Sequence, residues 1–204
     1  MYDGVFRQVG VRRARTVDEL SATLLAFDQL PAPRGRNLFV LTQAGGPGIY
    51  STDILAGDGE VRFARVSDET RAALRDVLPP FASVCKPEGH ADMTAAASAV
   101  QHGRALETVL SDDGVDAALL LTVPVLFVPA EAIAEEIIAA HHRLQASGID
   151  KPFVPVLLSG DVVEHGRAAL AGAGIMAPGR PEDAAKALGH VIAYHSRRRG
   201  DARE

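Results

Sequence analysis

Short apolar runs alternate along this chain with stretches of helical periodicity. From Asn37 onward the runs are continuously apolar, which indicates strands buried on both faces of a sheet. Helical stretches connect successive runs, and this order predicts a parallel sheet covered by helices on both sides. The predicted strands are 37–42, 61–66 (the weakest), 81–85, 116–123, 153–159 and 174–176. The predicted helices are 48–57, 68–78, 97–111, 130–147, 162–172 and 181–198.

The first 30 residues precede this alternation and are predicted to form two helices joined by a basic extended piece, VRRAR. Thr16 is the expected N-cap of the second helix, and Glu19 stands three residues on, as a capping box requires. Apolar residues at helical spacing predict one apolar face for that helix. These residues are Leu20, Leu24 and Phe27.

The pattern divides the chain into three parts. Residues 1–34 form an N-terminal helical extension that ends in the linker PAPRGR, residues 35–195 form one domain, and residues 196–204 are typical of a frayed charged tail. We therefore predict an α/β fold: a flavodoxin-like three-layer α/β/α sandwich with a mostly parallel sheet, preceded by a helical extension.

Composition narrows the class of protein. The 204 residues are 47% hydrophobic, carry a net charge of −5 and have a pI of about 5.8, which argues against nucleic acid or an anionic membrane as a partner. A single cysteine excludes an internal disulfide. No apolar run approaches the roughly 18 residues of a transmembrane helix, and the N-terminus lacks the apolar core of a signal peptide. We expect a cytoplasmic protein.

The stretch TQAGGPG (residues 42–48), which we call the glycine loop, follows the first strand of the predicted sheet and opens its first helix. Ligands of open α/β sheets bind at the carboxyl ends of strands. A helix N-terminus offers unpaired N–H groups, and glycines let an anion approach them closely. The loop is neither a Walker loop nor a GxGxxG motif. It is either a phosphate site formed by Gly45, Gly46, Pro47 and Gly48, or a tight turn in which the glycines serve packing.

Six stretches together carry a resemblance that covers nearly the whole chain. They are YDGVFRQVGV (2–11), GRNLFVLTQAGGPGIYSTD (35–53), LPPFASVCKPEGHADMT (78–94), SDDGVDAALLL (111–121), KPFVPVLLSG (151–160) and AGIMAPGRPEDAAKALGHVIAY (173–194). In this order they resemble the NDP-forming acyl-CoA synthetases (ADP-forming acetate–CoA ligases), which are relatives of succinyl-CoA synthetase. The GGPG loop and the PEDA…Y ending are the most specific matches.

This resemblance implies that different domains of the enzyme carry out different steps of the reaction. In such enzymes a phosphorylated histidine carries phosphate between a site that makes acyl-CoA through an acyl phosphate and an ATP-grasp site that exchanges phosphate with ADP or ATP. The helix after GGPG is one of two whose N-termini bind the phosphohistidine. The resemblance therefore assigns the glycine loop to that phosphate, within a succinyl-CoA-ligase-like flavodoxin domain.

The sequence also departs from the family pattern. The Ser-His-Thr-Gly-type loop with the phosphorylated histidine precedes the Tyr-Asp segment in the family; that loop is absent here, as are the CoA-binding and ATP-grasp parts. Local departures are Gln43 for the usual Asn, Lys86 where Asn is preferred, an inserted Glu88-Gly89-His90 before Asp92, and Met176-Ala177 where Pro-Val is common.

Among the seven histidines, His90 is the most interesting, because it follows a predicted strand on the edge of the sheet that holds the glycine loop. An imidazole there could be a switch, a ligand or a phosphate acceptor, although an exposed loop residue is the interpretation we favour. The others lack a Cys or carboxylate constellation at ligand spacing, so no metal site is predicted. They are His102, His141, His142, His165, His190 and His195.

The remaining candidates for catalytic or binding residues are expected to have structural roles. Cys85 ends a strand without a recognisable His–carboxylate pair, which favours a buried thiol over a nucleophile. Asp92 is expected to cap the following helical region rather than orient a phosphate, and Asp53 is expected to be structural. Acidic residues at the start of a helix suit its dipole. These residues are Glu131, Glu135 and Glu136.

We therefore expect a subunit or fragment of an NDP-forming acid–CoA ligase that supplies the phosphate-binding helix and no catalytic residue. Its partner would carry the CoA-binding domain and phosphohistidine loop, an ATP-grasp subunit, or both. CoA and ATP or ADP with Mg would bind to partner domains, with no cofactor held tightly by this chain. A homo-oligomer is a further option. The alternative function is a non-catalytic binding or scaffolding module derived from such an enzyme.

Overall fold

The computed structural model describes residues 2–57 and 59–201, which contain a six-stranded sheet. The strands run in the order β3-β4-β1-β5-β6, and β2 pairs with the start of β1. Pairing is parallel except between β3 and β4. The strands are β1 (Asn37–Thr42), β2 (Arg62–Phe63), β3 (Ser83–Val84), β4 (His90–Asp92), β5 (Ala117–Thr122) and β6 (Phe153–Leu157).

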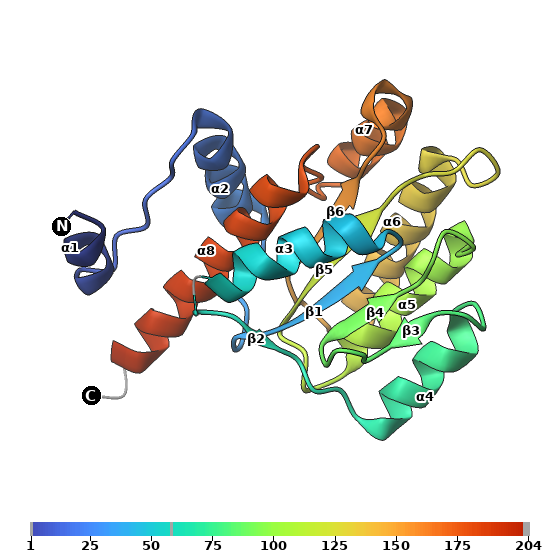
Figure 1. The fold of residues 1–204 in the computed structure, drawn as a ribbon, viewed down its shortest axis with the longest axis horizontal. Helices are drawn as coiled ribbons and strands as arrows, with labels where there is room; N and C mark the ends of the chain where they lie inside the picture. The colour runs from blue at the N-terminus through green and yellow to red at the C-terminus, as the bar shows by residue number, and fades with distance from the viewer. Residues whose placement is uncertain (1, 58, 202–204) are drawn as a thin grey trace.

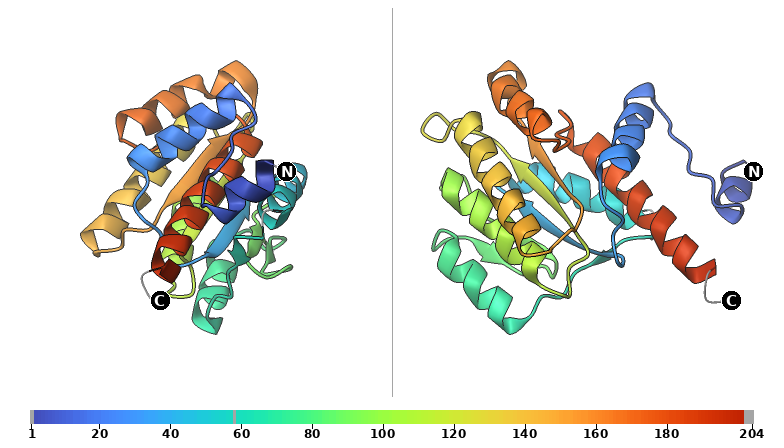
Figure 2. Two further views of the ribbon diagram at one scale, coloured as in Figure 1. Left: turned by 90° about the vertical axis from the view of Figure 1, so that its left-hand side faces the viewer. Right: turned by 180° about the vertical axis from the view of Figure 1, so that it is seen from behind.

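Helices cover both faces of the sheet (Figures 1 and 2). One face is covered by α3 and α8, and the other by α4, α5 and α6, with α7 against α6. The N-terminal α2 packs on α8, and α1 lies farther from the sheet (Figure 1). The helices are α1 (Tyr2–Gln8), α2 (Val17–Gln29), α3 (Gly45–Gly57), α4 (Asp68–Val77), α5 (Ala99–Ser111), α6 (Ala130–Ala146), α7 (Glu164–Gly172) and α8 (Pro181–Asp201), with a 3₁₀ turn η1 (Gly160–Val163) before α7.

Side chains of β1 alternate between the two layers of the core. Leu38 and Val40 pack with the α3 and α8 side, whereas Phe39 and Leu41 pack with the α5 and α6 side, and all four are fully buried. Burial on both faces explains why the sequence of this strand is a continuous apolar run. The predicted α/β class, with a mostly parallel sheet flanked by helices and an N-terminal helical extension, is confirmed.

The strand order β4-β1-β5-β6 corresponds to positions 2-1-3-4 of a flavodoxin-like sheet. A fifth strand was expected at 174–176, and that prediction is wrong, because no strand follows β6 in the described residues. Gly174 has φ +74, and the Ile175 amide donates to Leu170 O at 2.9 Å, so these residues close the end of α7. Ile175 and Met176 are still buried against the core.

The shortest strands differ most from the sequence prediction. Only Ser83–Val84 of the predicted 81–85 is a strand, and it runs antiparallel to β4, while Phe81 is exposed. Only Arg62–Phe63 of 61–66 is a strand. The three residues of β4 were not predicted at all, because HAD contains no apolar run from which a strand could be recognised.

The predicted helices occur with small shifts at their ends. The largest shifts are at α3, which begins at Gly45, and at α8, which continues to Asp201 through most of the expected frayed tail. Residues 202–204 of that tail, like Met1, lie outside the described residues. Within the described chain, no helix combines the length and apolar character needed to cross a bilayer.

Only one of the two hydrogen bonds of the predicted capping box is present at the start of α2. Thr16 Oγ1 accepts a hydrogen bond from the Glu19 amide at 3.1 Å, as expected. The Glu19 carboxylate, however, accepts from the amide of Arg15 rather than from that of Thr16. Glu19 is 3% exposed, and its second role is to pair with α8.

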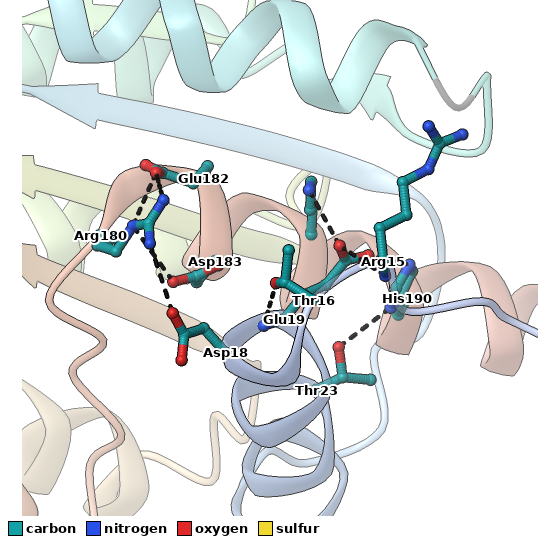
Figure 3. A network of polar contacts seen from close by, with 10 residues as sticks. Arg15, Thr16, Asp18, Glu19, Thr23, Arg180, Glu182, Asp183 and His190 are labelled. Atoms are coloured by element: carbon teal, nitrogen blue, oxygen red, sulfur yellow. Dashed lines mark hydrogen bonds and ion pairs between the residues drawn. The ribbon is translucent and has the colours of Figure 1, made fainter.

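The face that α2 buries includes two polar side chains (Figure 3). Glu19 pairs with Lys186 Nζ at 3.0 Å, and Thr23 Oγ1 shares a 3.1 Å hydrogen bond with His190 Nδ1. Ala26 completes the buried stripe. The predicted apolar face of α2 is instead solvent-exposed. Its residues Leu20, Leu24 and Phe27 are 48%, 61% and 38% exposed, respectively.

The buried carboxylate on α2 predicts a stability difference between two neighbouring acids. Glu19→Ala should lower the free energy of unfolding by about 2 kcal/mol, because Lys186 loses its partner in a partly buried interface. Asp18→Ala is the matched control: its 3.5 Å pair with Arg180 is exposed, so the loss should stay below about 1 kcal/mol. Urea unfolding of both variants measures the difference, and equal losses would contradict the account of the α2–α8 contact.

Candidate functional site

The glycine loop turns the chain from the carboxyl end of β1 directly into α3. Gln43 N donates to Leu121 O at 2.8 Å, which ties the loop to the neighbouring β5. Because α3 begins at Gly45, Pro47 lies in its first turn, where a missing N–H is tolerated. The N-terminus of α3 is thereby fixed at the carboxyl edge of the sheet, where ligands of such folds bind.

The glycines of the loop lie in two different surroundings. A Cβ at Gly48 would lie 2.9 Å from Thr42 Cγ2, so this glycine permits close packing of helix on strand. A Cβ at Gly46 would meet nothing within 4 Å, and neither Gly45 nor Gly46 has a positive φ. The packing interpretation therefore holds for Gly48, whereas the fold does not require a glycine at position 46.

Two exposed amides stand at the start of α3. Gly45 and Gly46 are exposed, and within the described residues their N–H groups have no backbone acceptor. The Ala44 amide is satisfied by Thr42 Oγ1 at 3.1 Å, and that hydroxyl donates in turn to Ala44 O at 2.6 Å. Free N–H groups and the positive end of a helix dipole are the features that helix N-termini use to bind anions.

The carboxylate of Asp92 lies beside these amides. Its Oδ2 is 3.8 Å from the position of a Cβ at Gly45, and its Oδ1 accepts from the Thr94 amide at 2.9 Å. The capping role expected for Asp92 is wrong, because Asp92 ends β4 and Ser98 caps α5. The parallel pairing of β4 with β1, which sets Asp92 opposite Thr42, brings this acid to the glycine loop.

Gln43 connects the loop to a buried histidine. Its Oε1 accepts from Thr122 Oγ1 at 2.6 Å and from the Val123 amide at 3.0 Å. Thr122 Oγ1 also lies 3.1 Å from Nε2 of His102, which is fully buried. Gln43 Nε2 is buried and has no hydrogen-bond partner among the described residues.

His102 has a defined tautomer in this network. Its Nδ1 lies 2.8 Å from the carbonyl of Ser98, so Nδ1 carries the hydrogen and donates. Burial lowers the pKa of His102 and outweighs that hydrogen bond, which raises it. Sequence reasoning missed this residue, although Ser98 and Gln101 form a complete capping box that marks the start of α5 and thus the position of His102 in its first turn.

His90 is not the exposed loop residue that we favoured. It opens β4, packs against Phe63 with 4.7 Å between ring centroids, and has a pKa lowered by burial. Its Nε2 lies 2.7 Å from Thr52 Oγ1 on α3, and its Nδ1 lies 3.0 Å from Glu88 O. Both ring nitrogens therefore have protein partners, and His90 holds α3 to the sheet.

The other sequence candidates lie away from the exposed amides or are inert. Cys85 is buried, and burial raises the pKa of its thiol, which disfavours the nucleophilic thiolate. Asp53 is exposed on α3. His190 lies in the α2–α8 contact, where its Nε2 is 3.9 Å from Glu19 Oε1. Within the described residues, no group of three or more His, Cys, Asp or Glu is placed to hold a metal ion.

Comparison with known proteins identifies the family of this α/β unit. The sequence profile of the Ligase-CoA domain matches residues 38–193, from β1 into α8. The chain belongs to the Ligase-CoA domain family. It is 34% identical over 190 residues to the subunit alpha of an ADP-forming acetate–CoA ligase II from Pyrococcus furiosus, covering 92% of this chain and 40% of the relative.

Two solved structures share the fold of this Ligase-CoA domain. PH0766 from Pyrococcus horikoshii has a TM-score of 0.84 and 32% identity, covering 96% of this chain and 43% of that one. The dinucleotide-forming acetyl-coenzyme A synthetase 1 of Ca. Korarchaeum cryptofilum, in complex with phosphate and ADP, has a TM-score of 0.83 and 26% identity, with coverages of 97% and 42%. The chain thus spans about two fifths of the length of these relatives.

The two kinds of glycine predict opposite effects of the same substitution. Gly48→Ala should cost about 1–3 kcal/mol of stability, because the new methyl group collides with Thr42. Gly46→Ala is the control and should leave stability unchanged or raise it by up to about 1 kcal/mol, since its Cβ has free space and φ is permissive. Thermal unfolding of both proteins tests this difference, and a stable Gly48→Ala variant would refute the contact.

The buried imidazole predicts a loss of stability in acid. The pKa of His102 is lowered in the fold from 6.5, so below about pH 6.5 the unfolded chain binds a proton that the folded chain does not. The free energy of unfolding should therefore decrease as the pH is lowered through this range, by at most about 1.4 kcal/mol per pH unit for each such proton.

Substitution of two histidines can isolate this contribution. His102→Gln should flatten the pH dependence without abolishing it, because the pKa of His90 is lowered too. His165→Gln, at an exposed imidazole, serves as the control. The measurement is urea unfolding between pH 5 and pH 8, and identical slopes for the wild-type protein and His102→Gln would rule out this contribution.

Proposed function

We propose that this chain is the Ligase-CoA component of an NDP-forming acid–CoA ligase and that the N-terminus of α3 binds the phosphoryl group of a phosphohistidine supplied by another part of the enzyme. The observation that carries the proposal is that Gly45 and Gly46 are exposed and that their N–H groups have no backbone acceptor in the described part of the chain. They stand at the carboxyl edge of the sheet, at the start of a 13-residue helix. The similarity to a ligase subunit alpha supports the enzyme class.

The geometry around the amides suits a phosphoryl group attached to a bulky side chain. Gly45 and Gly46 have no side chain that would shield the N–H groups, and a Cβ at Gly46 would have open space around it. Two N–H donors can meet two phosphoryl oxygens, while the helix dipole stabilises their negative charge. This contribution is electrostatic, since fixed donors hold a group that other residues transfer.

Asp92 would distinguish a phosphohistidine from free phosphate. Its carboxylate Oδ2 lies next to Gly45, where its charge weakens the binding of free phosphate but offers an acceptor to the N–H of a protonated imidazole. In the proposed complex Asp92 accepts a hydrogen bond from the unphosphorylated ring nitrogen of the phosphohistidine, which carries a hydrogen only in the protonated, cationic imidazole, a form that the carboxylate favours. Gly45 and Gly46 bind the phosphoryl oxygens. The chain then supplies donors and one acceptor, and the histidine, CoA, nucleotide and Mg belong to partner domains.

Phosphate binding by the isolated chain can be tested directly. Inorganic phosphate at high concentration should shift the ¹⁵N–¹H resonances of Gly45 and Gly46. Gly46→Val should weaken this binding about two- to fivefold, because a side chain beside the amides hinders the approach of the anion. Gly57→Val, at the opposite end of α3 and also with open space, is the matched control. Wild-type affinity in Gly46→Val, with both variants folded, would exclude phosphate binding at this helix terminus.

The alternative scaffolding function differs in its dependence on partners. Affinity capture of the tagged chain from its own cell extract, followed by mass spectrometry, should recover a chain with a CoA-binding domain and a phosphohistidine loop, or with an ATP-grasp domain. The reconstituted assembly should consume acid, CoA and ATP, and this turnover should be lost with Gly46→Val. Recovery of unrelated proteins, without turnover, would favour a scaffold.

A further inference from the structure

The segment between β5 and α6 carries two large apolar side chains into solvent. The Val128 amide donates to Val125 O at 2.9 Å, and the two residues form an isolated antiparallel bridge, so residues 125–128 make a β-turn. Leu126 and Phe127 occupy its central positions and are 105% and 75% exposed. We call this pair the apolar knob.

A leucine and a phenylalanine are unusual at the centre of a tight turn. Such positions favour Gly, Pro, Asn, Asp and Ser, whose conformational preferences or side-chain hydrogen bonds suit the turn. The base of this turn is anchored: Val128 is 8% exposed and packs in the core with the half-buried Val125. Pro129 follows directly as the N-cap residue of α6. The knob is therefore displayed in a fixed place rather than on a loose loop.

The apolar knob lies on the same edge of the sheet as the exposed amides. The segment starts at Val123, whose amide donates to Gln43 of the glycine loop at 3.0 Å. In Figure 1 the loop between β5 and α6 projects beyond the sheet on the side where α3 begins. The next strand, β6, is followed by Val162, which is 70% exposed. Three adjacent strands, β1, β5 and β6, thus each end in an exposed group suited to contact with another molecule.

We infer that the apolar knob is the docking element by which this domain binds the part of the ligase that presents the phosphohistidine, inserting into an apolar pocket there. The inference rests on the proposed function, which requires a protein surface to cover this edge closely enough for a side chain to reach Gly45 and Gly46. The relatives are more than twice the length of this chain, so they contain further protein that can supply such a surface.

The double substitution Leu126→Ser/Phe127→Ser tests the inference. Its affinity for the purified ligase chain recovered by affinity capture should fall at least about tenfold, because the knob is the buried anchor of the contact. Binding of inorganic phosphate to the isolated domain should be unchanged. Val17→Ser/Leu24→Ser removes apolar side chains from α2 that are 77% and 61% exposed. This variant is the control and should bind the partner as the wild-type protein does. Calorimetric titration gives the affinities, and thermal unfolding verifies the fold of each variant.

The outcomes separate this inference from the proposed function. If Leu126→Ser/Phe127→Ser binds the partner with wild-type affinity, the docking role of the apolar knob is contradicted, whereas the proposed phosphate site is unaffected. Self-association of the wild-type chain that disappears in the double variant assigns the knob to a second copy of the chain and also overturns the inference. Weaker phosphate binding in Gly46→Val, with partner affinity kept within about threefold, is the result expected if both proposals hold. If the wild-type chain recovers no ligase partner, the proposed function fails, and the docking role fails with it.

Discussion

The close contact between Gly48 and Thr42 is the constraint on which the site depends. A side chain at position 48 would collide with Thr42, so the backbone of α3 rests directly on the end of β1. Three glycines and a proline make a poor first turn by intrinsic propensity. The helix begins there because Thr42 closes the turn with Ala44, and because Ser51 and Leu55 are buried further along α3. Packing on the sheet, rather than local preference, therefore fixes where the exposed amides stand.

Because β1 is the central strand of the sheet, residues from distant parts of the chain lie next to the glycine loop at its end. Its parallel pairing with β4 sets Asp92 beside Thr42, and its pairing with β5 brings Thr122 and Val123 to Gln43. These segments are 50 to 80 residues from the glycine loop in the sequence. The strand order, more than any single motif, makes one edge of the molecule carry the amides, the carboxylate and the apolar knob together.

Elements whose burial leaves a local pattern of apolar residues could be predicted from the sequence. β1, β5 and β6 were recognised because strands buried on both faces must be continuously apolar, and Pro47 and Gly48 follow from the needs of a strand-to-helix turn. The polar side of α2 could not be predicted, since Glu19 and Thr23 are buried against Lys186 and His190, about 167 residues away. Periodicity marked Leu20 and Leu24 as part of one apolar face, but it reports where apolar residues lie, not which partner a helix has. β4 is too short for any pattern, so the places of His90 and Asp92 required the structure.

The exposed amides and the apolar knob are complementary in energetic terms. An anion at a solvent-exposed helix terminus gains only about 0.3–1 kcal/mol from the dipole, and salt weakens even that. The same donors act far more strongly once water is excluded, because the effective dielectric constant falls. Among the described residues no segment covers Gly45 and Gly46, which are exposed. In the proposed enzyme, a partner held over this edge by Leu126 and Phe127 would exclude that water. Strong phosphate binding would then depend on docking of the partner, and the phosphoryl group would be held firmly only in the assembled enzyme.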